Sequence, residues 1–310
     1  SRVRRMIPHY DATALAALNL TAQDIIAMLQ KLIRGAADGT VHAAPKAALT
    51  PSDGRYIMAT LAAMDSPPVA VTKSLVLNAA NTARGLPQIN GLVSLLDAET
   101  GLPLATLDNN WLTGVRTAGL SALAAHYLAR PDANSVGFVG AGLQARCHLA
   151  LFREMFPLTR IKIAGRGRAN IDALIEAADG LDAEVVSSPR AALVGVDLAV
   201  TSVTHTAVEA PFLDANWLAP GAFVSVVDLA VPWHKASFGA VDRVIIDDLE
   251  QEASLPNKLA DPAHIHGDLS GLVMGDAQPR QSDTERTAFV FRGHALGDLA
   301  LAALAWGRLA

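Results

Sequence analysis

The chain has 310 residues, of which 51% are hydrophobic and 18% charged, and its formal net charge is −5 at pH 7. This length favours two domains, and the hydrophobic fraction is typical of a folded protein with a large core. The acidic balance argues against a nucleic-acid partner, and no apolar run reaches the roughly 18 residues that span a bilayer. The single cysteine, Cys147, cannot form an internal disulfide, as is usual in a reducing compartment. We therefore expect a cytoplasmic protein that binds neither nucleic acid nor membrane.

The first third of the chain predicts one amphipathic helix and an antiparallel sheet. A helix is expected after Thr21, because Thr21 and Asp24 have the spacing of a capping box and Ile25, Leu29 and Ile33 follow at helical spacing. Apolar residues then alternate along residues 69–77, and strands are expected at residues 92–96 and 104–107 on either side of a turn. A long helix is predicted from Thr113 to about residue 128.

Two cations in this region lie where a cation is unfavourable. Lys73 shares the period-two face of Val69 and Val71, so it interrupts a row that faces the core. It would either anchor a substrate carboxylate or donate a proton, and snorkelling at the end of the sheet is the alternative. Arg116 is expected in the first turn of the helix that starts near Thr113. A cation there opposes the helix dipole unless an anion binds beside it or solvent surrounds it.

The second half of the chain alternates between strands and helices. Strands are predicted at residues 135–139, 161–164, 183–186, 198–202, 223–227 and 244–247. Amphipathic or alanine-rich segments separate several of them, a pattern that predicts a doubly wound parallel sheet. The polar segment 255–284 predicts no element, and residues 296–309 predict an Ala/Leu helix that could return to the first domain. The expected fold class is therefore α/β, a Rossmann domain plus an α+β domain with an antiparallel sheet.

The first of these strands runs directly into a dinucleotide-binding fingerprint. Gly140, Gly142 and Ala145 form a G-x-G-x-x-A pattern between a strand and a helix. Gly140 permits the tight turn, Gly142 lets a pyrophosphate approach the backbone, and Ala145 permits close helix packing. A plain tight turn is the alternative. The residues expected to contact the cofactor are Gly140, Gly142, Leu143, Gln144, Ala145, Arg166, Arg168, Thr201 and Ser202.

The end of the second predicted strand bears on which dinucleotide is bound. NAD sites usually place an acidic residue there for the ribose 2′-hydroxyl. This chain instead has Arg166 and Arg168 in a glycine-rich turn, and guanidinium groups match a 2′-phosphate. NADP(H) is therefore favoured and NAD(H) is possible, with a solvated arginine pair as the alternative reading.

Asp228 follows the fifth strand of this half. Ligands of open α/β sheets bind beyond the carboxyl ends of the strands, so Asp228 is a candidate acid/base, although an aspartate that caps a loop is equally common there. His264 and His266 form an H-x-H pair with no third ligand at a suitable spacing, and we expect no metal site.

Together these residues resemble the ornithine cyclodeaminase/mu-crystallin family of NAD(P)-dependent enzymes. The resemblance covers most of the chain, and it rests on Lys73, Gly85-Leu-Pro87, Asp97-Ala-Glu-Thr-Gly-Leu-Pro103, Leu112-Thr-Gly-Val-Arg-Thr-Ala118, Val139-Gly-Ala-Gly-Leu-Gln-Ala145, Asp228 and Gly293-His-Ala-Leu-Gly-Asp298. It implies a homodimer with a substrate-binding and dimerisation domain over residues 1–114, completed by 288–310, and a Rossmann domain over 115–287. It also implies that Lys73 and Arg116 hold the substrate carboxylate, and that Asp228 is the acid/base.

Two positions of the expected substrate site depart from the family pattern. Lys46 stands where the family usually has arginine, and Gln88 where it often has threonine. With Lys73 and Arg116 they complete the expected substrate-binding set, and they indicate an altered pocket.

We expect an NADP(H)-dependent reductase of small imino acids, such as Δ1-pyrroline-2-carboxylate, that yields the L-amino acid. The alternatives are an ornithine cyclodeaminase, which is an NAD-dependent ammonia lyase that forms proline, an alanine-dehydrogenase-like oxidoreductase, and a non-catalytic protein that binds NADPH and a small ligand.

Overall fold

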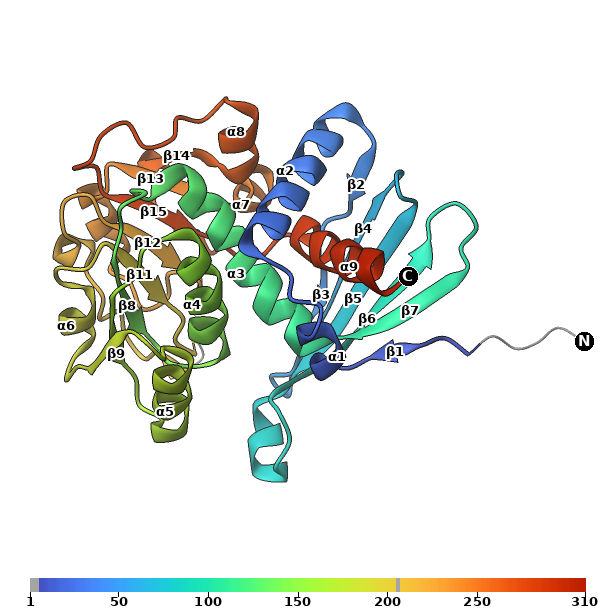
Figure 1. The fold of residues 1–310 in the computed structure, drawn as a ribbon, viewed down its shortest axis with the longest axis horizontal. Helices are drawn as coiled ribbons and strands as arrows, with labels where there is room; N and C mark the ends of the chain where they lie inside the picture. The colour runs from blue at the N-terminus through green and yellow to red at the C-terminus, as the bar shows by residue number, and fades with distance from the viewer. Residues whose placement is uncertain (1–5, 205–206) are drawn as a thin grey trace, which may run out of the picture. The chain divides into compact units, whose positions relative to one another are not determined.

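The computed structural model describes residues 6–204 and 207–310, which form two units (Figure 1). The first contains the chain up to Arg116 together with His294–Ala310, and the second is Thr117–Gly293. The boundary after Arg116 falls within helix α3 (Asn109–Leu128).

The first unit is built on a seven-stranded sheet in the order β1-β7-β6-β5-β4-β2, with β3 also paired to β4. Its strands are β1 (His9–Tyr10), β2 (Val41–Ala43), β3 (Ala47–Leu49), β4 (Tyr56–Met64), β5 (Val69–Leu77), β6 (Ile89–Asp97) and β7 (Pro103–Asp108). Strands β5, β6 and β7 pair antiparallel, as the sequence predicts; β4, which was not predicted, also pairs antiparallel to β5, whereas β1 pairs parallel to β7. The strand predicted at residues 69–77 is β5, and Lys73 on it is 1% exposed.

Helices α2 (Ala22–Asp38) and α9 (Ala295–Leu309) pack against each other, and α9 contacts β4 and β5 (Figure 1). The predicted start of α2 is confirmed: the Thr21 hydroxyl accepts from Asp24 N (3.1 Å), and the Asp24 carboxylate accepts from Thr21 N (3.0 Å). The unit also contains helix α1 (Ala12–Ala16) and the 3₁₀ helix η1 (Ala79–Arg84). Segments far apart in the sequence thus form one layer over the sheet.

Helix α3 begins earlier than the sequence pattern indicates, at Asn109 instead of Thr113. The reason is local, because the Asp108 carboxylate accepts a hydrogen bond from Trp111 N (2.7 Å), as an N-cap residue does. Arg116 therefore lies about two turns into the helix and not in its first turn. The expectation that Arg116 opposes the dipole of a free helix end is wrong, and its role depends on its neighbours.

The second unit is built on an eight-stranded parallel sheet in the order β10-β9-β8-β11-β12-β15-β13-β14. Its strands are β8 (Ser135–Val139), β9 (Arg160–Ala164), β10 (Asp182–Val185), β11 (Leu198–Thr201), β12 (Phe223–Val226), β13 (Arg243–Ile246), β14 (Ile265–Asp268) and β15 (Thr287–Val290). Its further helices are α4 (Leu143–Met155), α5 (Arg168–Ala177), α6 (Pro189–Leu193), α7 (Leu249–Ser254) and α8 (Leu269–Met274), with η3 (Ala215–Trp217), η4 (Lys235–Ala240) and η5 (Pro262–His264). The six predicted strands are all present, each end within one residue of its predicted position. The doubly wound α/β fold is confirmed, and β14 and β15 add two strands that the sequence did not predict.

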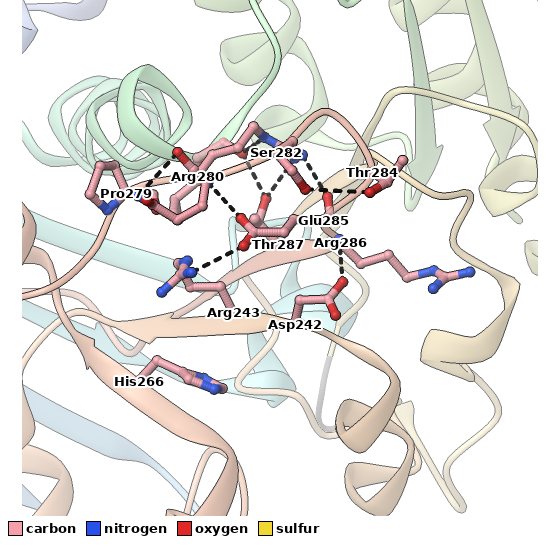
Figure 2. Close-up of polar contacts among 12 residues, drawn as sticks. Asp242, Arg243, His266, Pro279, Arg280, Ser282, Thr284, Glu285, Arg286 and Thr287 are labelled. Atoms are coloured by element: carbon pink, nitrogen blue, oxygen red, sulfur yellow. Dashed lines mark hydrogen bonds and ion pairs between the residues drawn. The ribbon is translucent and has the colours of Figure 1, made fainter.

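A polar cluster around Arg280 lies near the start of β15, a strand in the interior of this sheet (Figure 2). The Arg280 guanidinium donates to the carbonyl oxygens of Leu128 (2.7 Å), Glu285 (2.6 Å) and Gly221 (3.0 Å). The Glu285 carboxylate also pairs with Arg243 (3.1 Å). This cluster lies where β13 and β15 begin, so in a parallel sheet it is at the edge opposite to the strand ends that carry the fingerprint loop.

Two features are absent from the residues that the structure describes. No helix there has both the length and the hydropathy to cross a membrane. No cluster of three or more histidine, cysteine, aspartate or glutamate side chains suited to a metal ion occurs in the same part of the chain.

Candidate active site

The fingerprint loop joins β8 to α4 and leaves open the backbone at the start of the helix. Gly140 has a φ of +96°, and a Cβ there would lie 2.8 Å from the carbonyl oxygen of Ser202, so only glycine fits. Gly142 is the N-cap of α4 with no side-chain cap, and no atom lies within 4 Å of where its Cβ would be. Ala145 is fully buried and lets the helix pack closely. The first backbone N–H groups of α4 therefore have no side chain above them, which is what a phosphate group needs.

A cavity of about 810 Å³ opens at this loop. It is bounded by residues 139–142, by the turn after β9 with Arg166, by residues 186–189 and by residues 202–204 and 207–210. The volume suits a large organic ligand. Gln144 Oε1 and Ser202 Oγ are buried without a hydrogen-bond partner among the described residues, and Ser202 lines the cavity. The residues present fit a dinucleotide.

The two arginines that are predicted to bind the 2′-phosphate of the cofactor differ in position. Arg166 lines the cavity. Arg168 is the first residue of α5 and does not line the cavity; its side chain is 85% exposed and pairs with Asp172 at 2.9 Å. The turn Gly165-Arg166-Gly167 after β9 carries no acidic residue, although Glu209 lines the cavity from another segment. Arg166 is thus the better candidate for contact with a ligand in this cavity.

The first unit contains a buried cluster of charges around Asp298 of α9. Its carboxylate is 2.8 Å from Lys73 Nζ and 3.2 Å from Arg116 Nε, and it accepts a hydrogen bond from the Thr60 hydroxyl at 2.8 Å. Thr60 and Lys73 are direct cross-strand partners on β4 and β5, which brings both to the same carboxylate. Arg116 Nε is buried and makes no hydrogen bond of acceptable geometry within the described residues. One carboxylate thus faces two cations, and a donor is left for an anion.

Burial and neighbouring charges shift the ionisation of this cluster. Burial, with a further contribution from Arg116, lowers the pKa of Lys73 to about 8, although Asp298 acts in the opposite direction. Lys46 also lowers the pKa of Lys73, so it belongs to the same electrostatic environment. Burial raises the pKa of Asp298, but Arg116 and Lys73 outweigh it and hold this pKa below its ordinary value. The cluster therefore carries excess positive charge at neutral pH.

Gln88 lies in the loop between η1 and β6 and is exposed. Its side-chain amide donates to the Thr82 hydroxyl at 2.9 Å, and its backbone carbonyl accepts from Asn78 N at 2.8 Å. These two hydrogen bonds connect the loop before β6 to η1 and its N-cap residue. The structure thus groups Lys73, Arg116 and Lys46 electrostatically, whereas Gln88 forms hydrogen bonds with Asn78 and Thr82 in its own segment.

Asp298 is the residue of this cluster to which the sequence pattern assigned no role. It stands in the motif Gly293-His-Ala-Leu-Gly-Asp298, but its partner Lys73 is 225 residues away in the chain. The available signal is a lone acidic residue within an Ala/Leu helix, buried at its first turn. That signal alone is also explained by the helix dipole.

Asp228 follows β12 in the second unit and is 2% exposed. One carboxylate oxygen accepts from the Thr201 hydroxyl (3.2 Å), and the other accepts from Val203 N (3.3 Å). Burial raises the pKa of Asp228 to about 7. An aspartate in this state can both donate and accept a proton near neutral pH. Thr201, which is predicted to contact the cofactor, directs its hydroxyl to Asp228.

The sequence model of the ornithine cyclodeaminase/mu-crystallin family matches residues 11–309 of this chain. Δ1-Pyrroline-2-carboxylate reductase of Paracoccus denitrificans is 30% identical over 235 residues, which are 72% of this chain and 74% of that protein. Ketimine reductase mu-crystallin of Rattus norvegicus is 29% identical over 239 residues, which are 76% of this chain and 74% of that protein. The solved structure of Δ1-pyrroline-2-carboxylate reductase of Thermococcus litoralis, in complex with NADH and L-proline, superposes with a TM-score of 0.87. It is 22% identical and covers 97% of each chain, so it shows the same fold.

Proposed function

The chain belongs to the ornithine cyclodeaminase/mu-crystallin family, and we propose that it is an NADP(H)-dependent reductase of small imino acids of the Δ1-pyrroline-2-carboxylate type, giving the L-amino acid. The buried cluster of Lys73, Arg116 and Asp298 carries this proposal, because its excess positive charge is what the carboxylate of such a substrate would balance. The relatives named as pyrroline-2-carboxylate and ketimine reductases support the same reaction.

In this proposal the cations of the first unit bind the substrate carboxylate. Lys73 supplies a buried ammonium, and Arg116 supplies a guanidinium whose buried Nε forms an ion pair with Asp298 but no hydrogen bond of acceptable geometry in the described chain. Lys46 adds charge to the same environment. A carboxylate accepts charge-assisted hydrogen bonds from such donors, and these are stronger than bonds between neutral groups. The α-carboxylate common to imino and amino acids is thus the part of the substrate that the chain recognises.

The cavity of the second unit would hold the dinucleotide. The α4 N-terminus beyond Gly142 faces the pyrophosphate, and Arg166 offers its guanidinium to a 2′-phosphate. A bound reduced nicotinamide supplies a hydride. The chain supplies the loop that has no side chain at Gly142 and the polar Ser202 at the cavity wall.

Asp228 would manage the proton of the reaction. Reduction of an imine adds a hydride to the carbon and places the former C=N π electrons on the nitrogen, which then takes up one proton. Protonated Asp228 can give that proton and afterwards recover one from solvent. A pKa of about 7 makes both steps accessible near neutral pH.

We also propose a homodimer joined through the outer face of the first unit's sheet. Cross-strand pairing puts Leu61 of β4, Val76 of β5, and Leu92 and Leu96 of β6 on one face, and all four are exposed. We propose that these four side chains form an apolar patch that marks an interaction surface. A second copy of the chain would cover it by a two-fold symmetric contact.

A substrate panel tests the reaction. Δ1-Pyrroline-2-carboxylate and linear imino acids are offered with NADPH and with NADH, and cofactor absorbance is followed. Oxidation of NADPH with formation of the L-amino acid is expected. Consumption of ornithine with no net change in cofactor would identify a cyclodeaminase, oxidation of L-alanine by NAD would identify a dehydrogenase, and cofactor binding without any turnover would identify a binding protein.

A further inference from the structure

A buried chain of hydrogen bonds ends at the carboxylate of Asp228. Trp233 Nε1 donates to the Thr201 hydroxyl at 3.1 Å, and the Thr201 hydroxyl donates to Asp228 Oδ1 at 3.2 Å. Thr201, Trp233 and Asp228 are all at most 2% exposed. Water therefore does not compete for these contacts.

The direction of this chain follows from its chemistry. An indole N–H can only donate, so Thr201 must accept from Trp233. The hydroxyl of Thr201 has a single hydrogen, which is directed at Asp228. Trp233 is itself held by stacking on Phe238, with ring centroids 5.4 Å apart. The orientation of the Thr201 hydroxyl is thus determined by a rigid aromatic side chain.

The backbone after Asp228 is held in an uncommon conformation that brings Trp233 back to this point. Leu229 and Ala230 have φ angles of 57° and 56°, in the left-handed region that residues other than glycine rarely adopt. The turn is closed by hydrogen bonds from Val231 N to the Asp228 carbonyl (3.1 Å) and from Trp233 N to the Ala230 carbonyl (3.1 Å). Such strain persists where the surroundings over-determine it, often at functional sites.

We propose that Thr201 and Trp233 are positioning residues that fix the orientation of the Asp228 carboxylate and stabilise its ionised form through the Thr201 hydroxyl. The inference rests on the proposed function in giving Asp228 the proton transfer. The second carboxylate oxygen accepts a hydrogen bond from Val203 N (3.3 Å), so among the described contacts each oxygen has one donor.

Few groups act on the pKa of Asp228, so the contribution of the Thr201 hydroxyl to that pKa should be measurable. Burial raises the pKa of Asp228, and the Val203 N–H and the Thr201 hydroxyl lower it. No charged side chain contributes in the part of the chain that the structure describes. Removal of the hydroxyl therefore removes one of the few groups that favour the ionised carboxylate.

The test is a pH titration of the full-length protein, followed by ¹³C NMR of carboxyl carbons labelled in aspartate. Asp228→Asn assigns the signal. Thr201→Val should move the Asp228 midpoint upward by about one pH unit, the order expected when a hydrogen bond to a charged group is lost. Thr201→Ser keeps the hydroxyl and should restore the midpoint, and Trp233→Phe should move it upward by less than Thr201→Val.

Ser225→Ala is the matched control, because it removes a buried hydroxyl from β12 whose partner is Ser121 (2.6 Å) and not Asp228. A Thr201→Val effect no larger than that of Ser225→Ala, or a failure of Thr201→Ser to restore the midpoint, would overturn the inference. If Thr201→Val does not fold, Thr201→Cys applies the same test with a weak thiol donor of similar size.

The titration needs no substrate, so it separates this inference from the proposed reaction. Should the midpoints follow the expected order while no imino acid is reduced, the positioning role stands and the proposed function fails. In an active enzyme, the Asp228-dependent limb of the kcat/KM profile should move with the NMR midpoint in each variant.

Discussion

Two buried side chains, Asp228 and Lys73, have pKa values brought towards neutrality by the same physical cause. Burial disfavours the charged form of either group, so it raises the pKa of Asp228 to about 7 and lowers that of Lys73 to about 8. Below both values Asp228 is a neutral acid and Lys73 is a cation. These are the states needed to give a proton to nitrogen and to bind a carboxylate.

The pH dependence of imine reduction follows from these two groups. As pH rises through about 7, Asp228 loses the proton it must donate, so kcat/KM should fall about tenfold per pH unit. Above about pH 8, Lys73 loses its charge and KM should rise. Initial rates measured from about pH 5 to about pH 9, roughly two units on either side of neutrality, check both limbs of the profile. A flat profile across this interval would contradict the assignment.

Replacement of Asp228 tests its role directly. Asp228→Asn cannot donate a carboxylic proton and should lower kcat by about 10²–10⁴, the usual contribution of general acid–base catalysis. NADPH affinity, measured by fluorescence titration, should be unchanged, which serves as the control for folding. Near-normal turnover on the best imine substrate would show that another group supplies the proton.

Replacement of Lys73 separates binding from chemistry. Lys73→Met keeps a long side chain in the β5 core and removes the ammonium, so KM for the imino acid should rise strongly. Arg116 and Thr60 still contact Asp298 in this variant, so the carboxylate is not left alone. Steady-state kinetics decide between the possibilities: a loss in kcat without a change in KM would assign proton transfer to Lys73.

At the scale of single elements, we expect the turn between β9 and α5 to determine the choice of cofactor. We expect kcat/KM to favour NADPH over NADH by at least about tenfold, which is roughly 1.4 kcal/mol. Arg166 lines the cavity and Arg168 pairs with Asp172, so Arg166→Ser should remove most of this preference and Arg168→Ser little of it. Kinetics of both variants with both cofactors form a matched pair. Equal use of NADPH and NADH by the unmodified protein would refute the assignment.

Elements with strong local patterns could be predicted from the sequence. The alternation around Lys73 gives β5 with its ends, and the apolar run before Gly140 gives β8. Strand β15 was not found this way, because its place between β12 and β13 depends on contacts that are distant in the sequence, such as the hydrogen bonds of Arg280 with Leu128 and Gly221. Local pattern carries no record of such distant contacts.

The residues of the candidate site also divide into those that local sequence pattern identifies and those that it does not. Lys73 and Asp228 were identifiable because each breaks an apolar pattern or follows a strand. Asp298 was not identifiable from local pattern, because the contact that places it in the site is with Lys73, 225 residues away in the chain. The role of Thr201 was also hidden, since a threonine after an apolar strand indicates cofactor contact as readily as a hydrogen bond to Asp228.

At the scale of the whole molecule, assembly through the outer sheet face can be tested by charge. Leu92→Glu places a carboxylate in the centre of the apolar patch, on a side chain that is already 43% exposed, so the fold should tolerate it. A second copy would then bury an unpaired charge, and the dimer should dissociate. Light scattering at micromolar concentration measures the mass, and Glu99→Gln in the exposed β6–β7 turn is a control that should leave it unchanged. An unmodified protein that is already monomeric would contradict the proposed interface.

The separation of Lys73 from Asp298 along the chain has a consequence for folding during synthesis. At about 5–20 residues per second, a ribosome needs roughly 11–45 s to add the 225 residues between them. For that time the nascent β5 strand carries a lysine that in the folded unit is buried against a carboxylate not yet made. The sheet face that α9 covers also stays open until residues 295–309 emerge. The second unit is continuous from Thr117 to Gly293, so we expect it to finish folding first although its synthesis begins later. We therefore expect the first unit to be translated to become native last, with its sheet face exposed until then.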